Sequence, residues 1–356
     1  MGKVLMKGNE AIAEAAIQAG CLNYFAYPIT PQSEVAEYLS RRLPEVGGRF
    51  LQGESEVAVG YMIFGASAAG ERVFTTSSSP GISLMSEAIS YIASAQLPAV
   101  LVNIVRGGPG LGGILPSQAD YFQATKGGGH GDYRLIVLAP ASVQEAVDMM
   151  MVAFPLAEKY RNPVMLLGDG LIGQMMEPVS FPDGPAVAPS NKDEWATNGM
   201  ETRNSDKRNL VRTLFLEAEA LSAHNEMLRD KYKLIEQNEV RYELYNMDGD
   251  YRLLVVSFGT MSRVCRTAID ILKEAGIEVG MLRPKSLWPF PVQAIREAAS
   301  KKSCVGVASI EMNMGQMIED VDRSVQGRCP VKWFGKAGGD IPTPEHVVDF
   351  LKGMLD

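Results

Sequence analysis

Residues 73–105 read VFTTSSSPGISLMSEAISYIASAQLPAVLVNIV and contain one complete strand–helix–strand unit. Residues 73–76 and 99–105 are short apolar runs rich in β-branched side chains, which is typical of buried strands. Between them, residues 82–95 repeat apolar side chains at helical spacing. A helix that joins two successive strands in this way indicates a parallel pair with a crossover connection. The stretch therefore predicts an α/β fold.

The same alternation extends on both sides of this unit, over residues 1–185. We expect further strands at residues 24–29, 50–52, 135–138 and 164–167, and further helices at 10–19, 31–42, 56–69 and 143–158. Strands at this spacing, joined by helices, form a mostly parallel sheet. Thr30 is expected to cap the second helix, with Pro31 at its first position, where the missing N–H costs nothing.

The rest of the chain divides into a linker with a charged helical segment, residues 186–250, and a second α/β unit, residues 251–356. Pro, Asn, Asp and Gly are frequent from 183 to 205, which is typical of a linker. Within the charged segment, four apolar residues recur at seven-residue spacing: Leu214, Leu221, Leu228 and Ile235. This stripe predicts a long helix or helical hairpin with one apolar seam. The seam packs on its own domain or contacts a partner subunit, and the sequence leaves both open.

The composition argues against several classes of protein. A net charge of −8 disfavours a general nucleic-acid binder, which needs a basic face. No apolar run reaches the roughly 18–20 residues of a membrane-spanning helix, and the N-terminus lacks the apolar core of a secretory signal. We therefore expect a cytoplasmic protein with no membrane contact. The four cysteines form no CxxC pair, which argues against an iron–sulfur cluster or a zinc site in this chain.

Polar residues stand where predicted strands end, which is where ligands bind in a parallel α/β sheet. Thr30 follows one strand, and Glu56 opens a helix directly after the next. Arg106 leaves a third strand and enters a glycine-rich loop that begins with Gly107 and Gly108. An arginine is the natural fork for a carboxylate, and glycines let the backbone approach a ligand closely. These residues are the candidates for a binding site.

Other well-known catalytic patterns are missing from the sequence. The glycines after Arg106 do not form the GxGxxG fingerprint of a dinucleotide-binding protein, and no phosphate loop ends in GK[ST]. With three histidines in the chain, no Ser/His/Asp arrangement or HExxH zinc motif can be assembled. Hydrolase and metalloprotease chemistry are therefore not supported.

Seven segments occur in an order that is typical of one family. They are YPITP (27–31), ESE (54–56), SSSPG (77–81), RGGP (106–109), APASVQE (139–145), LRPKSLWPFP (282–291) and EMNMGQ (311–316). Together they resemble the α-type, pyrimidine-binding subunits of thiamine-diphosphate-dependent 2-oxoacid:ferredoxin oxidoreductases. Within that family, three further segments are most similar to the branched-chain enzyme, which acts on 3-methyl-2-oxobutanoate: GLGG (110–113), PSQADYF (116–122) and KGGGHGD (126–132).

The resemblance implies roles for the candidate residues. Glu56 would hydrogen-bond N1′ of the aminopyrimidine, with Glu54 in its place if the register differs. Arg106 would hold the substrate carboxylate, and Thr30 would donate a hydrogen bond near the reacting carbonyl. The other implied contacts are Pro28, Ile29 and Ser79 for the cofactor, and Gly107 and Gly108 for the substrate.

The resemblance also implies a division of labour between chains. Residues 1–185 would form a pyrimidine-type thiamine-diphosphate domain, and residues 251–356 a transketolase C-terminal-like α/β domain. A β subunit would supply the diphosphate and Mg²⁺ site, because Gly168-Asp169-Gly170 lacks the asparagine that follows in that metal motif. A γ subunit and a ferredoxin-like iron–sulfur subunit would complete the enzyme. Its reactants would be the 2-oxoacid, coenzyme A and ferredoxin.

Two other functions stay open on the sequence alone. The 2-oxoglutarate enzyme of the same family would need a further cation for the distal carboxylate, and Lys126 and His130 are the candidates. A non-catalytic assembly subunit would not need Glu56 and Arg106, which are both present.

Overall fold

Seven strands form the larger sheet, in the order β12-β6-β7-β5-β4-β2-β3. The structure, a computed structural model, describes residues 2–182, 188–200 and 206–356. The strands of this sheet are β2 (Asn23–Ala26), β3 (Arg49–Gln52), β4 (Val73–Ser77), β5 (Val100–Val105), β6 (Ile136–Leu138), β7 (Val164–Asp169) and β12 (Ser286–Trp288). All paired neighbours run parallel except β12 and β6. The predicted α/β class and the mostly parallel sheet are confirmed.

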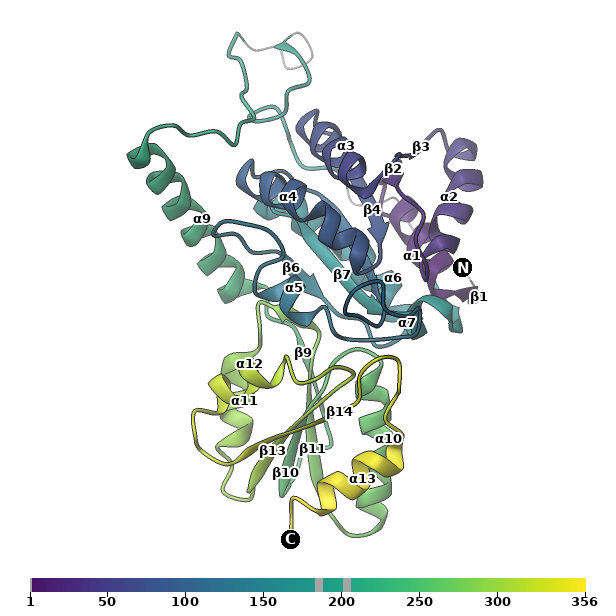
Figure 1. Cartoon of the computed structure of the whole chain (residues 1–356), viewed down its shortest axis with the longest axis vertical. Helices are drawn as coiled ribbons and strands as arrows, with labels where there is room; N and C mark the ends of the chain where they lie inside the picture. The colour runs from purple at the N-terminus through teal and green to yellow at the C-terminus, as the bar shows by residue number, and fades with distance from the viewer. Residues whose placement is uncertain (1, 183–187, 201–205) are drawn as a thin grey trace.

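Helices pack on this sheet in two groups (Figure 1). The helices are α1 (Gly8–Gln18), α2 (Ser33–Glu45), α3 (Glu56–Ala68), α4 (Pro80–Ser94), α5 (Tyr121–Thr125), α6 (Val143–Tyr160) and α7 (Gly170–Gln174). Helix α3 packs on α4, whereas α1 packs on α2 and α6. A short antiparallel pair, β1 (Val4–Lys7) and β8 (Met176–Val179), joins the two ends of this unit.

One predicted helix start is wrong. Thr30 does not cap α2, which begins at Ser33 with Gln32 as its N-cap residue. The N–H of Gln32 donates to Ile29 O over 3.2 Å, so residues 29–32 form a turn before the helix. Because this turn intervenes, Thr30 belongs to the loop after β2 and not to the helix.

The second sheet has five strands in the order β14-β13-β10-β11-β9. They are β9 (Tyr242–Tyr245), β10 (Leu253–Val256), β11 (Val279–Pro284), β13 (Gly306–Glu311) and β14 (Val331–Gly335). Four helices accompany them: α10 (Met261–Glu274), α11 (Val292–Ala299), α12 (Ile318–Val325) and α13 (Pro344–Lys352). Strand β9, which pairs antiparallel with β11, lies in a segment for which only helix was predicted.

The charged segment contains one long helix, α9 (Ala218–Asn238), along the side of the upper unit in Figure 1. Leu228 and Ile235 are buried, whereas Leu214 precedes the helix and is 69% exposed. The seam of α9 packs on the chain itself, since Tyr232 meets Trp288 edge to face with ring centroids 5.7 Å apart. Parts of the predicted linker, residues 183–187 and 201–205, lie outside the described residues. Among the described residues, no helix combines the length and apolarity needed to cross a bilayer.

Buried polar pairs join the two α/β units. Arg283 of β11 is 2% exposed and donates to Glu145 of α6, with Nη1 and Oε2 2.9 Å apart. The same guanidinium donates to Glu243 of β9, with Nε and Oε2 2.9 Å apart. Thr260 Oγ1 donates to Asp169 Oδ1 over 3.0 Å. The sequence segments 139–145 and 282–291 therefore meet at this junction.

Candidate active site

The carboxyl ends of β2, β3, β4 and β5 lie at the same edge of the larger sheet, because these strands run parallel. At this edge each strand passes to a loop or a helix start that carries one residue predicted for the site. Thr30 follows β2, Glu56 begins α3, Ser79 precedes α4, and Arg106 follows β5. The topology thus gathers residues that are up to 76 positions apart in the sequence.

Glu56 is 7% exposed and occupies the first turn of α3. Ser55 caps the helix by accepting from Ala58 N–H over 3.2 Å. The first turn of α4 passes close to the Glu56 carboxyl at Gly81, where an added Cβ would lie 2.9 Å from Glu56 Oε1 and 2.1 Å from Ser77 Oγ. A glycine is therefore required at this contact. The alternative glutamate, two residues earlier, is exposed.

Arg106 is also 7% exposed and ties two loops together. Its Nη1 donates to Thr30 O over 3.0 Å, and its Nη2 donates to Leu111 O over 3.2 Å. The buried Nε has no hydrogen-bond partner among the described residues. Arg106 thus contacts Thr30, another residue predicted for the site, and its Nε donor is unpaired.

Ser79 links the turn before α4 to the end of β5. Its φ is +21°, an uncommon value for a residue other than glycine. Ser79 Oγ accepts from Arg106 N–H over 3.1 Å, and Ser79 N–H donates to Asn103 Oδ1 over 3.0 Å. Asn103 Nδ2 in turn donates to Asp120 Oδ2 over 2.8 Å.

Asn103 and Asp120 were not among the predicted site residues. A signal for Asn103 was present, because it is the one polar residue in the apolar run of β5 (VLVNIV). No sequence pattern showed that Asp120, on the loop beyond, would reach it.

The remaining predicted residues lie on the same loops. Gly107 is buried and its N–H donates to Leu115 O over 3.1 Å, whereas Gly108 is exposed. Pro28 is exposed and Ile29 is half-buried on the loop after β2. Their contacts with a cofactor or a substrate stay predictions.

Two buried serine hydroxyls lie at this end of the sheet, and that of Ser77 lies close to Glu56 at Gly81. Ser77 Oγ and Ser78 Oγ are both buried and have no hydrogen-bond partner among the described residues. A buried polar group without a partner is costly, so these hydroxyls favour a polar ligand at this end of the sheet. An aminopyrimidine offers donors and acceptors on one edge, which matches a carboxyl and two hydroxyls.

Among the described residues, no group of three or more His, Cys, Asp or Glu side chains could hold a metal ion. Asp169, the acidic residue of the sequence GDG, has a structural role. Its Oδ1 accepts from the N–H groups of Leu171 and Ile172 and from Thr260 Oγ1. Burial raises the pKa of Asp169, while these hydrogen bonds act in the opposite direction.

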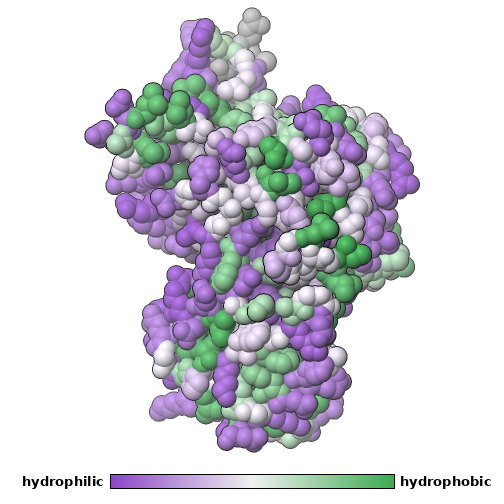
Figure 2. Space-filling view, in the orientation of Figure 1, coloured by the Kyte–Doolittle hydropathy of each residue, from purple (hydrophilic) through white to green (hydrophobic). Residues whose placement is uncertain are grey.

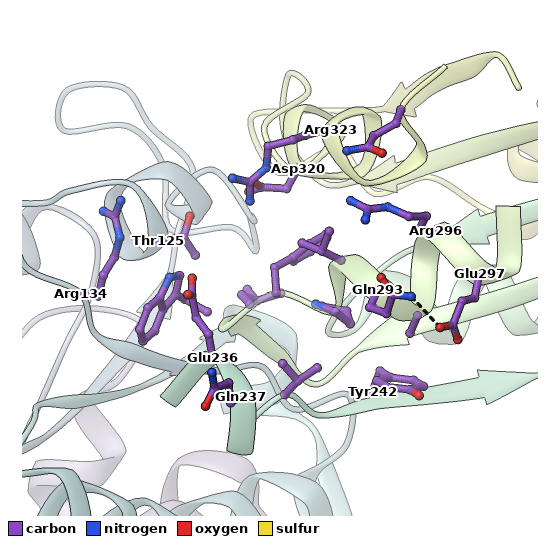
Figure 3. A pocket seen from close by; sticks show the side chains of 18 of the residues that line it. Thr125, Arg134, Glu236, Gln237, Tyr242, Gln293, Arg296, Glu297, Asp320 and Arg323 are labelled. Carbon is purple, nitrogen blue, oxygen red and sulfur yellow. Dashed lines mark hydrogen bonds and ion pairs between the residues drawn. The ribbon is translucent and has the colours of Figure 1, made fainter. Parts of the chain in front are cut away.

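A separate cavity of about 760 Å³ opens between the two α/β units (Figure 3). Arg134, Arg296, Arg323 and Glu236 point toward it from both units, beside the buried Trp288. None of the predicted site residues, Thr30, Glu56, Ser79 and Arg106 included, lines this cavity. The candidate site is therefore at the sheet edge and not in this interdomain space.

Comparison with known proteins identifies the family of this chain. Residues 14–242 match the family model for pyruvate flavodoxin/ferredoxin oxidoreductase, thiamine diphosphate-binding, and residues 252–347 match pyruvate:ferredoxin oxidoreductase core domain II. The sequence is 49% identical to the ketoisovalerate oxidoreductase subunit VorB of Methanothermobacter thermautotrophicus, over 99% of this chain and 98% of the relative. The chain belongs to the 2-oxoacid:ferredoxin oxidoreductase family. The family predicted from the ordered sequence segments is confirmed.

Other members of this oxidoreductase family are similar along the whole chain. The 2-oxoglutarate synthase subunit KorA of M. thermautotrophicus is 36% identical over 98% of both chains. A solved structure of 2-oxoglutarate:ferredoxin oxidoreductase from Magnetococcus marinus superposes with a TM-score of 0.88 at 26% identity, covering all of this chain and 66% of that one. A split-gene transketolase, at 14% identity and a TM-score of 0.61, shares the fold. The predicted pairing of a thiamine-diphosphate domain with a transketolase C-terminal-like domain is thereby confirmed.

Proposed function

We propose that the chain is the pyrimidine-binding subunit of an enzyme that oxidatively decarboxylates 3-methyl-2-oxobutanoate to an acyl-CoA and CO₂ while reducing ferredoxin. The observation that carries this proposal is the buried Glu56 carboxyl beside the unpaired Ser77 hydroxyl, at the sheet edge where Arg106 meets Thr30. The choice of substrate follows the 49%-identical relative, which is named a ketoisovalerate oxidoreductase subunit.

Thiamine diphosphate, when bound, supplies the nucleophilic carbon and the electron sink that decarboxylation of a 2-oxoacid requires. Glu56 is placed to hold a proton between its carboxyl group and N1′ of the aminopyrimidine. Ser77 and Ser78 would take the remaining polar atoms of the ring edge. Pro28, Ile29 and Ser79 are the further proposed contacts.

Arg106 would orient the substrate by its carboxylate, with Gly107 and Gly108 leaving room for it. A guanidinium has five N–H donors. In Arg106, two of them donate to Thr30 O and Leu111 O. The rest, including the unpaired Nε, remain for a carboxylate. We place the Thr30 hydroxyl near the reacting carbonyl, because Thr30 is exposed and bonded to Arg106 through its own carbonyl.

The site needs partner chains to become complete. The loop after Arg106 exposes apolar side chains, with Leu111 84%, Ile114 61% and Leu115 55% exposed, and α3 exposes Val57 and Tyr61. Figure 2 shows apolar patches on this face near the junction of the two α/β units. Exposed apolar surface of this kind marks a protein contact. We propose that a β subunit covers it and supplies the diphosphate and Mg²⁺ site.

The remaining partner subunits are inferred from the electron transfer that the reaction requires. Oxidation of a 2-oxoacid releases two electrons, whereas ferredoxin accepts one at a time, so iron–sulfur clusters must lie between them. Three of the four cysteines of this chain, Cys21, Cys265 and Cys304, are buried and free. We therefore propose that a γ subunit and a ferredoxin-like subunit complete the complex in the cytoplasm. Residues 1–185, 186–250 and 251–356 are the proposed domain division.

The 2-oxoglutarate reaction of related proteins is the alternative, and one of its two candidate cations already has a partner in the structure. Lys126 Nζ lies 2.7 Å from Asp320 Oδ1 in an ion pair. His130 packs edge-on against Tyr91, with ring centroids 6.0 Å apart. Lys126 therefore already has a carboxylate partner, whereas His130 is exposed and remains a candidate for the distal carboxylate.

The decisive experiment uses the complex co-purified from its native source. Reduction of ferredoxin or a viologen in the presence of coenzyme A is measured with 3-methyl-2-oxobutanoate, 2-oxoglutarate and pyruvate side by side. We expect the highest kcat/KM for the branched acid. A preference for another oxoacid would show that the proposed substrate is wrong, while the proposed mechanism would stand. No turnover with any oxoacid, in a complex that contains thiamine diphosphate and iron–sulfur clusters, would favour a non-catalytic assembly role.

A further inference from the structure

A polar side chain in the centre of an apolar strand needs an explanation. Asn103 lies in β5, is fully buried, and is flanked by valine, leucine and isoleucine. Its amide is paired at both ends, because Oδ1 accepts from Ser79 N–H over 3.0 Å and Nδ2 donates to Asp120 Oδ2 over 2.8 Å. Asn103 therefore bridges the turn before α4 to the loop beyond Arg106.

Ser79 is the point at which this bridge reaches the site. Its positive φ is an unfavourable conformation that surrounding contacts must hold. Its N–H is fixed by Asn103, and its hydroxyl contacts both the N–H and the carbonyl of Arg106. The same turn carries Ser77, which lies against Glu56 at Gly81. The bridge thus controls where both Glu56 and Arg106 sit relative to each other.

Asp120 anchors the far end of the bridge to the second α/β unit. Gln118 N–H donates to Met312 O over 2.9 Å, and Tyr121 OH donates to Asp320 Oδ2 over 2.7 Å. Asp120 lies in the sequence between these two contacts, which link its loop to the second unit. Burial raises the pKa of Asp120, while hydrogen bonds from Asn103 and Ser79 act in the opposite direction.

We propose that Asn103 and Asp120 are positioning residues, which hold the turn at residues 77–81 against Glu56 and Arg106 and couple it to the second α/β unit. The segment at residues 116–122, which resembles the branched-chain enzyme, then acts on the reaction through this turn and not by touching the substrate. The inference rests on the proposed function, since it needs Glu56 and Arg106 at the reacting centre.

The direction of the hydrogen bonds provides a sharp test. Asn103→Asp keeps an acceptor for Ser79 N–H but removes the donor to Asp120, so two carboxylates face each other. Asp120→Asn alone keeps an acceptor for Asn103 and is the milder change. The double variant N103D/D120N reverses the donor and acceptor and restores the bridge with the same shape. A role in packing alone would not predict that the double variant is better than N103D.

The variants are compared in the reconstituted complex by two measurements. Amide hydrogen exchange of the peptide that contains residues 77–82 is measured without thiamine diphosphate, and kcat and KM are measured with the oxoacid that the wild type oxidises fastest. We expect N103D to accelerate exchange of this peptide and to lower kcat on the order of 10- to 100-fold, as for a misplaced reacting group. N103D/D120N should recover most of both losses.

Asn162→Asp is the matched control, because Asn162 is fully buried and its Nδ2 donates to Arg134 O at the opposite end of the sheet. It should lower thermal stability and leave exchange of residues 77–82 and kcat unchanged. Wild-type kcat in N103D, or a double variant no better than N103D, would overturn the inference. Failure of the proposed function is distinguishable, since it would appear as absent turnover in the wild type while the exchange data still report on the turn.

Discussion

The carboxyl of Glu56 is the smallest unit on which the proposed chemistry depends. Glu56→Gln preserves shape and removes the proton-sharing oxygen, so we expect exchange of the thiamine C2 proton to slow by at least about 10²-fold, the usual contribution of a positioned acid–base group. Proton exchange in the reconstituted complex, followed by NMR, measures this directly. A normal rate in Glu56→Gln combined with a slow rate in Glu54→Gln would transfer the role to the exposed neighbour.

Arg106 has two separable functions, and different substitutions distinguish them. Its guanidinium bonds the carbonyls of Thr30 and Leu111, and its unpaired donors remain for a carboxylate. We expect Arg106→Ala to raise KM for the 2-oxoacid roughly 10- to 100-fold, because a charge-assisted contact is worth about 1.5–3 kcal/mol. Arg106→Lys keeps the positive charge but loses the bidentate geometry of the guanidinium, so its KM should lie between those of the wild type and Arg106→Ala. An unchanged KM for the oxoacid in Arg106→Ala would show that the carboxylate binds elsewhere.

At the scale of elements, substitutions in α9 test whether its apolar stripe packs on the chain itself or contacts a partner subunit. Leu228 is 3% exposed, whereas Leu221 on the same helix is 43% exposed. Leu228→Ala should therefore lower the free energy of unfolding by roughly 2–5 kcal/mol, and Leu221→Ala by less than about 1 kcal/mol. Urea denaturation followed by circular dichroism compares the two. An equal loss in both variants would mean that the exposed face of α9 is also covered in solution.

The elements also show how far the sequence carries a fold prediction. Strands β4 and β5 and helix α4 could be predicted, because their periodicity is local and strong. Strand β12 could not be predicted, because its three residues are too few to show a hydrophobic period. It also belongs to the second unit in sequence but pairs with β6 in the sheet of the first unit. The predicted start of α2 was wrong because a turn at residues 29–32 precedes the helix. The candidate site residues at strand ends were predicted from their position, whereas Asp120 reaches Asn103 through a loop path that no local pattern encodes.

At the scale of the whole molecule, an ion cluster around the buried Arg283 couples the two α/β units. Burial disfavours the charged carboxyl of Glu145, but hydrogen bonds and charge from Arg283, with Lys285 and the Ala141 N–H, outweigh it and lower its pKa to about 2. In the unfolded chain the same carboxyl has its ordinary pKa of 4.5. The folded state therefore binds this proton less tightly. The stabilisation is fully present above about pH 4.5 and is lost as the pH falls toward 2.

This linkage predicts how Glu145→Gln differs from the wild type as the pH changes. At pH 7 we expect the variant to be less stable by on the order of 3 kcal/mol, which corresponds to the pKa difference. Arg283, 2% exposed, would then keep only Glu243 as its partner. Between pH 5 and pH 2 the wild type should lose its advantage and the two stabilities should converge. Urea denaturation at a series of pH values measures the gap.

A matched substitution separates this cluster from a general effect of removing a carboxylate. Glu37 is exposed on α2, so Glu37→Gln should follow the wild-type pH dependence throughout the range. If the gap between wild type and Glu145→Gln stayed constant down to pH 2, the ionised form of Glu145 would not be what stabilises the junction, and packing around Arg283 would account for the loss. A gap that closes for Glu145→Gln alone would identify the ionised Glu145 as one of the contacts that hold the second unit on the first, beside those of Thr260 with Asp169 and of Tyr121 with Asp320.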